Sequence, residues 1–254
     1  MKGKWKIRKE LKIGVALAVL FFFVAFTERK LGSQSVNDVI VKVENVDDNH
    51  FIDEEDILKL IRLDRENLKG ADLARLNLKE IESRIKSDRF IQDADLYSDI
   101  KGNLIVRATL RRPIARIIRN DGPDAYVAED GTIMPVSSKF TARVMLISGD
   151  QVRKLLEREN ITTDESGRHL ITLLHMIGND DFWRAQIAQL HITAKDKIIM
   201  LPQIGAQTIE FGTADKAEEK LKKLKIFYKE ILPQMGWNRY KRVNVEYDKQ
   251  LIAE

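Results

Sequence analysis

The sequence predicts an α+β protein with a single N-terminal transmembrane helix, a small βααββ unit and a β-rich mixed α+β unit that ends in an edge strand. Three observations predict this order. An uncharged run follows a basic N-terminus, two helix-start patterns lie between strand patterns before residue 112, and short strands dominate after it. Pro113 marks the junction, because proline lacks the N–H that a central strand needs.

The run from Ile13 to Thr27 contains no charged residue, and six Lys or Arg residues precede it within positions 1–12. Fifteen helical residues span about 22 Å, less than a hydrocarbon core of roughly 30 Å. We therefore extend the predicted span to residues 13–31, with the flanking lysines reaching toward the headgroups. The positive-inside rule places residues 1–12 in the cytoplasm and the bulk of the chain in the periplasm or extracytoplasmic space, with the span in the cytoplasmic (inner) membrane.

Two other interpretations of this run stay open. A cleaved signal peptide also has a basic head and a short apolar centre, but Ala25-Phe-Thr-Glu-Arg-Lys30 lacks the small residues of a cleavage site. A buried core helix would not lie beside six cations. An uncleaved single-pass anchor is the interpretation that the residues favour.

Composition excludes several classes of function. The net charge is +4, but the first 30 residues contain eight Lys or Arg and two acids, so residues 31–254 carry a net charge of −2. The bulk of the chain therefore has no electrostatic footprint for nucleic acid. Cysteine is absent, which excludes disulfides, thiol nucleophiles and thiolate metal sites.

Residues 36–112 carry the pattern of the small unit. Asp53 precedes a helix start, and Asn77 with Glu80 forms a capping box for a second helix. Between Leu104 and Leu110 apolar residues occupy every second position, which predicts a strand with one buried face. The expected strands are 37–45, 90–97 and 104–110.

Residues 113–254 carry the β-rich unit, and Asp130-Gly131 predicts the turn of a hairpin over 126–135. We expect Thr213 to cap a long helix whose lysines face water, and Pro233 to end it. Segment 162–168 has the composition of a linker. The other expected strands are 114–119, 144–147, 187–193, 198–201, 207–211 and 243–247, and the other helices are 151–160 and 169–177.

The order and spacing of these segments resemble the FtsQ/DivIB family of bacterial cell-division proteins. The segments that carry the resemblance are Leu104–Ala115, which ends in Arg-x-Pro-x-Ala, the hairpin Tyr126–Pro135, Phe211-Gly212 before the long helix, and Val243–Tyr247. The resemblance implies a POTRA-like domain over 36–112 and an FtsQ-type β domain over 113–254. The chain departs from the family at Arg89-Phe90, where Pro-Trp is frequent, and at Asn244-Val-Glu-Tyr247, where Asp-x-Arg-Tyr is frequent.

No pattern of catalytic or cofactor-binding residues is visible. The four histidines (His50, His169, His175, His191) match no metal-ligand spacing, and Ser148-Gly149 lacks the pattern of a nucleophile elbow. A glycine-rich phosphate loop is absent as well. We therefore predict a protein that is not an enzyme, with no catalytic or metal-binding residue, no cofactor and no small-molecule substrate.

The last predicted strand has no successor, so we expect it at a sheet edge with one row of backbone groups unpaired. An extended partner segment can pair with such an edge. The resemblance implies that FtsB- and FtsL-like proteins bind there, outside the membrane, so that the chain recruits and regulates septal cell-wall synthesis within the divisome. The candidate partner-binding residues are Val243, Asn244, Val245, Glu246, Tyr247, Lys249 and Leu251.

Glu246 stands where the family frequently has arginine. We therefore expect the partner to present a basic or neutral group to this position. The POTRA-like domain is a second place where further division proteins could dock, through its own sheet edges, but the sequence singles out no residue there.

Two alternative functions belong to other classes. A POTRA-containing component of an envelope protein assembly or secretion system would carry the same first domain, but the strands for a barrel are missing. An anchored envelope hydrolase would need clustered catalytic groups. Turnover of cell-wall fragments by the extracytoplasmic part would identify the hydrolase.

Overall fold

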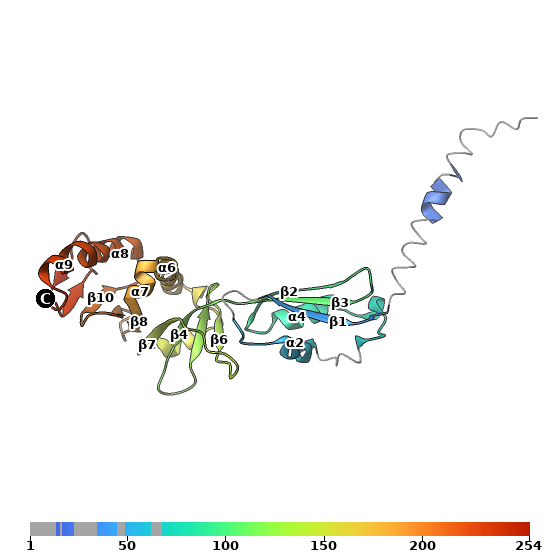
Figure 1. The fold of residues 1–254 in the computed structure, drawn as a ribbon, viewed down its shortest axis with the longest axis horizontal. Coiled ribbons are helices and arrows are strands. Elements are labelled where there is room, and N and C mark those ends of the chain that lie inside the picture. Colours follow the sequence, from blue (N-terminus) through green and yellow to red (C-terminus); the bar gives the residue numbers. More distant parts are fainter. Residues whose placement is uncertain (1–13, 16, 23–34, 45–48, 62–67) are drawn as a thin grey trace, which may run out of the picture. The chain divides into compact units, whose positions relative to one another are not determined.

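A computed structural model describes residues 14, 15, 17–22, 35–44, 49–61 and 68–254 (Figure 1). The chain folds into two compact units. Unit 1 comprises the described residues within Met1–Val43, Glu54–Ser87 and Asp93–Ala108. Unit 2 comprises those within Glu44–Asp53, Asp88–Gln92 and Thr109–Glu254.

The βααββ order predicted for the small unit is confirmed. Its strands form a three-stranded sheet in the order β1-β3-β2, and the ends of β2 and β3 at residues 91–92 and 109–110 belong to unit 2. The elements are β1 (Val39–Glu44), α2 (Glu54–Ile61), the 3-10 turn η1 (Leu73–Arg75), α4 (Leu78–Lys86), β2 (Ile91–Ser98) and β3 (Leu104–Leu110).

Local chemistry explains where α4 begins and how it packs. The Asn77 side chain accepts a hydrogen bond from Glu80 N–H, so the predicted helix cap is confirmed, but the Glu80 carboxylate accepts from the Asn77 side-chain amide and not from the backbone N–H of a capping box. Ile81 and Ile85 lie on the buried face. At its other end, Arg84 donates to the carbonyl of Ile61 at the end of α2, which joins the two helices.

Unit 2 contains nine strands in one mixed sheet, in the order β12-β11-β10-β9-β8-β7-β4-β5-β6. The strand pairs β4–β7, β7–β8 and β10–β11 are parallel, and the other pairs are antiparallel. The strands are β4 (Pro113–Ile117), β5 (Ala125–Ala128), β6 (Ile133–Pro135), β7 (Met145–Gly149), β8 (Ile187–Ile192), β9 (Ile198–Pro202), β10 (Thr208–Gly212), β11 (Arg242–Asn244) and β12 (Ile252–Ala253).

Helices cover one face of this sheet, with α6, α8 and α9 along the same side of strands β7 to β10 (Figure 1). Leu173 and Leu224 are fully buried and pack with Leu190 of β8 in one core. The helical elements are α5 (Val152–Leu156), the 3-10 turn η2 (Ile161–Thr163), α6 (Glu165–Asn179), α7 (Asp181–Gln186), α8 (Ala217–Ile226), the π-helical turn η3 (Phe227–Ile231) and α9 (Leu232–Met235).

The predicted break at Pro113 and the predicted hairpin are both confirmed. β3 ends at Leu110, and β4 begins at Pro113 beside β5. β5 and β6 are antiparallel, with Tyr126 opposite Met134. Gly131 in the turn has φ +84°, a conformation that glycine adopts without strain.

Two predictions between residues 151 and 168 are wrong. The helix expected over 151–160 ends at Leu156. The segment expected to be a linker is ordered, because Asn160 caps η2 and Asp164 caps α6 through the Gly167 N–H. Ser, Asn and Asp favour helix caps as much as loops, so composition alone misled the prediction.

The predicted ends of the long helix are also wrong. The Thr213 hydroxyl donates to Asp215 instead of capping the helix, and α8 begins after Lys216, which has φ +50°. Pro233 does not end the helix, because after the π-helical turn it stands in the first turn of α9, where proline's missing N–H costs no helical bond. The wider turn lets the chain continue through the proline to Met235.

The predicted membrane span over residues 13–31 lies largely outside the described residues. None of the helices in the described part of the chain is long and apolar enough to cross a membrane.

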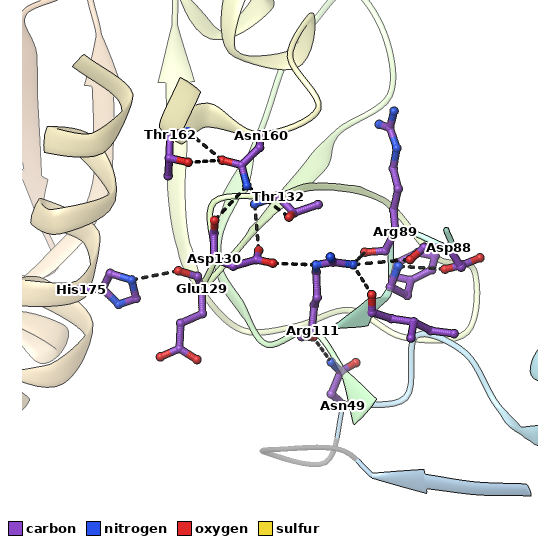
Figure 2. A network of polar contacts seen from close by, with 12 residues as sticks. Asn49, Asp88, Arg89, Arg111, Glu129, Asp130, Thr132, Asn160, Thr162 and His175 are labelled. Atoms are coloured by element: carbon purple, nitrogen blue, oxygen red, sulfur yellow. Dashed lines mark hydrogen bonds and ion pairs between the residues drawn. The ribbon is translucent and has the colours of Figure 1, made fainter. Parts of the chain in front are cut away.

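One arginine ties several segments of unit 2 together (Figure 2). Arg111 donates from its guanidinium to the carbonyls of Asp88, Arg89 and Ile91, and Arg111 Nε lies 2.9 Å from the Asp130 carboxylate. Its own carbonyl accepts from Asn49 Nδ2 at 2.7 Å. A single side chain therefore binds three backbone carbonyls where the chain enters β2.

The acceptor of this arginine is itself held in place. Asp130 accepts from Thr132 N–H at 3.0 Å, and the Asp130 carbonyl accepts from Asn160 Nδ2 at 2.9 Å. Burial alone would raise the pKa of Asp130, but the bonds from Thr132 and Arg111 outweigh it and lower the pKa. The ionised carboxylate therefore stabilises the folded unit.

We predict that Asp130→Asn lowers the free energy of unfolding at pH 7 by about 1–2 kcal/mol, because a charge-assisted bond becomes a neutral one. Because the pKa of Asp130 is lower in the folded than in the unfolded chain, its ionised carboxylate stabilises the fold at pH values above the unfolded pKa of about 4. This stabilisation is lost as the pH falls through the pKa of the folded chain. The difference between variant and wild type should therefore shrink on acidification from about pH 5 toward pH 3.

Urea unfolding followed by tryptophan fluorescence measures this, since Trp183 is buried in the core of unit 2. Asp150→Asn, at an exposed turn position, is the matched control and should change stability little at any pH. A pH-independent difference for Asp130→Asn would contradict the assigned role of its charge.

A candidate partner-binding edge at the C-terminus

The prediction that Val243–Tyr247 forms the last strand at the sheet edge is wrong. The strand β11 ends at Asn244 and lies between β10 on one side and β12 on the other. The terminal strand in the sheet order is β12, at the end marked C in Figure 1. The edge exists, but a two-residue strand that carries no visible sequence pattern forms it.

A tight turn brings the chain back to form β12. Lys249 has φ +57°, and Gln250 N–H approaches the Tyr247 carbonyl. Arg242 and Glu254 then exchange two backbone hydrogen bonds, of 2.9 and 3.0 Å. The side chains of Arg242 and Glu254 also form an ion pair, at 2.6 Å. The Glu254 carboxylate raises the pKa of Arg242.

The outer side of β12 has no neighbouring strand among the described residues. Successive residues of a strand direct their N–H and C=O groups to opposite sides. Since Glu254 pairs inward with Arg242, the backbone groups of Ala253 and Leu251 point away from β11. This row of backbone donors and acceptors is the candidate site, which we call the β12 edge.

The predicted binding residues lie in three different environments. The side chains of Val243 and Val245 are fully buried in the core of unit 2, so they cannot contact a partner. Leu251 and Asn244 are half-buried, and Asn244 donates to Glu210 at 2.6 Å. Tyr247, 55% exposed, and Lys249 are open to solvent, as is Ile252 of β12, which the sequence did not single out.

The carboxylate of Glu246 is paired within the chain. Lys197 Nζ, in the turn between β8 and β9, lies 2.6 Å from it, and Glu246 raises the pKa of that lysine. Gly212 lies directly beneath: a Cβ there would lie 2.7 Å from Glu246 Cγ. The expectation of a basic or neutral partner group at Glu246 stays a prediction, but this carboxylate does not need a partner's cation for compensation.

One pair of polar side chains was not foreseen. Ser148 and His191 lie on paired strands, with Ser148 Oγ 3.2 Å from His191 Nδ1. Gln189 donates to the same Oγ at 2.6 Å. The pair is a cross-strand contact on the sheet, and in the part of the chain that the structure describes no carboxylate bonds to the imidazole.

Fold and site together define a two-unit α+β protein whose candidate site is a backbone edge suited to another polypeptide. Comparison with protein families adds the rest. The family described as FtsQ/DivIB, C-terminal related, matches residues 112–254, and a POTRA-like domain matches residues 34–109. The chain therefore belongs to the FtsQ/DivIB family of bacterial cell-division proteins. A search of curated proteins found no match.

We predict that Gly212→Ala destabilises unit 2 by about 1–2 kcal/mol, because alanine is strained at positive φ and its Cβ would displace Glu246. Gly178→Ala in α6 is the matched control, since a Cβ there meets nothing within 4 Å. The control should be neutral or stabilising by up to about 1 kcal/mol. Urea unfolding of both variants measures the difference, and equal stability of the two would contradict the close packing of Gly212 on Glu246.

Proposed function

We propose that this chain is a non-catalytic bitopic scaffold of the division machinery. In this proposal it binds FtsB- and FtsL-like proteins outside the cytoplasmic membrane and so recruits and regulates septal cell-wall synthesis. Membership of the FtsQ/DivIB family supports the role in division, and the proteins of this family are typically non-catalytic. The observation that carries the proposal is the unpaired outer side of β12.

The proposed contact is strand addition. An extended partner segment would pair its backbone with the outward N–H and C=O groups of Ala253 and Leu251 and extend the sheet by one strand. Main-chain pairing along two residues gives little affinity or specificity alone, so side chains must supply the rest. The side chains of Ile252 in β12 and of Tyr247 before it are exposed and offer apolar contact area.

A membrane anchor is the second part of the proposal. The predicted span over residues 13–31 would hold the two units outside the cytoplasm, with residues 1–12 inside. Anchoring confines the chain and its membrane-bound partners to one surface, which raises their effective concentration for each other. A short edge can then be sufficient for assembly.

We predict that Ala253→Pro weakens binding of the extracytoplasmic parts of FtsB- and FtsL-like proteins from the same bacterium. Proline removes the outward N–H of residue 253 and leaves the inward pairing of Glu254 in place. Pull-down with the full-length chain in detergent measures this. A loss of at least about tenfold in affinity is expected, the scale of one main-chain bond together with the side-chain contacts that depend on it.

Ala253→Val is the matched control, because valine keeps the N–H and favours strands. Truncation after Gln250 removes only β12 and its flanking residues, whereas truncation after Arg242 would also delete the buried Val243 and Val245. Retained binding by Ala253→Pro and by the shorter truncation would move the site away from the β12 edge. Absence of binding by the wild type would contradict the proposed partners.

The orientation can be tested separately, because the chain contains no cysteine. Ile100, fully exposed in unit 1, and Lys6 in the basic head are suitable positions for single cysteines. We predict that a membrane-impermeant maleimide labels Ile100→Cys in cells with a permeabilised outer layer and leaves Lys6→Cys unlabelled until the membrane is lysed. Equal labelling of both before lysis would rule out the proposed orientation.

A further inference from the structure

A lysine of α8 lies against the turn that leads into β12. Lys223 Nζ is 2.8 Å from the carbonyl oxygen of Val245, 2.5 Å from that of Tyr247 and 3.1 Å from that of Gln250. An ammonium group has three N–H donors. Each donor therefore has one acceptor, and all three acceptors belong to the segment between β11 and β12.

These carbonyls have no regular secondary structure to pair with. Residues 245–251 lie outside any strand or helix, and the turn bond from Gln250 N–H to the Tyr247 carbonyl is long, at 3.5 Å. β12 itself has only two residues in its ladder with β11. The backbone pairing alone gives a short strand little hold on the sheet.

The surroundings of the Lys223 ammonium as a whole disfavour its charged form. Burial lowers the pKa of Lys223, and the neighbouring Lys220 and Lys216 add to this, while Asp248 and Glu219 oppose it. Lys216 is itself paired with Asp248 in the same turn, at 3.1 Å. Two lysines therefore bind the turn: Lys223 of α8 binds its backbone, and Lys216, which precedes α8, binds its carboxylate.

The other lysines of α8 do not share this role. Lys222 is exposed, and Lys225 pairs with Asp180 at 2.8 Å. Lys220 is buried and binds the Thr213 carbonyl and Asp215 in the preceding loop. The prediction that the lysines of this helix face water is therefore wrong for Lys220 and Lys223, since each donates to a backbone carbonyl of a neighbouring loop.

We propose that Lys223 is the positioning residue of the partner-binding edge: by binding three carbonyls of residues 245–250 it holds β12 on β11 and so presents the outward backbone groups of Ala253 and Leu251. This inference rests on the proposed function, because it assumes that partners bind the β12 edge, which Lys223 keeps ordered. A partner that binds only the ordered edge has its apparent affinity reduced by the fraction of chains in which β12 is detached.

Hydrogen exchange with mass spectrometry on the full-length chain tests this, together with affinity for the extracytoplasmic part of the FtsB-like protein. In Lys223→Met we expect the peptide spanning 243–254 to exchange about tenfold faster or more, as loss of charge-assisted bonds implies, with peptides of β8 and β9 unchanged. Partner affinity should fall at least about fivefold, as the detached fraction of β12 grows. Lys223→Arg, which keeps several N–H donors, should restore both, and Lys222→Met should change neither.

Unchanged exchange of residues 243–254 in Lys223→Met would overturn the inference, whatever the partner does. Faster exchange with partner affinity within twofold of the wild type would also overturn it, because the order of β12 would then not matter for binding. If the wild type itself fails to bind, the proposed function fails, and the exchange of the two lysine variants still decides whether Lys223 holds the strand.

Discussion

The C-terminal end of the nine-stranded sheet depends on β11 having a neighbour on each side. Parallel pairing with β10 satisfies one side, and the other side is satisfied only because the chain turns at Lys249 and returns as β12. That return buries Val243 and Val245, and it moves the unpaired backbone row from β11 outward to Ala253 and Leu251. Where the candidate site lies therefore follows from a turn of a few residues.

Two cations hold the irregular parts of unit 2 in the same way. Arg111 binds carbonyls of residues 88, 89 and 91, and Lys223 binds carbonyls of residues 245, 247 and 250. In both places a single side chain with several donors binds three backbone carbonyls within a few residues of one another. Each of these two residues binds several groups of one segment, so a substitution there removes more than one contact. Exposed ion pairs, by contrast, contribute little to stability.

The parts of the fold that sequence could predict are those with a strong local signal. Alternation from Leu104 to Leu110, the Asp130-Gly131 turn and the Asn77 helix cap each act over a few residues, and all are confirmed. The β12 strand carries no such signal, because two residues show no period and their pairing depends on a contact with α8. Lys223 and the Ser148–His191 pair were missed for the same reason: tertiary packing, which spacing along the chain does not encode, brings their partners to them. At Pro233 a local rule was correct in general, but a π-helical turn overrode it.

The central claim is that a partner adds a strand to β12, and cysteine cross-linking tests it most directly because the chain has no cysteine of its own. Ala253→Cys would be combined with single cysteines placed in turn along the extracytoplasmic segment of the FtsB-like protein. Strand addition predicts cross-links at every second partner position, because side chains of a strand alternate between its two faces. Cross-links that recur every three to four positions would indicate a helix at this edge, and their absence at every position would place the contact elsewhere; either result would contradict the account.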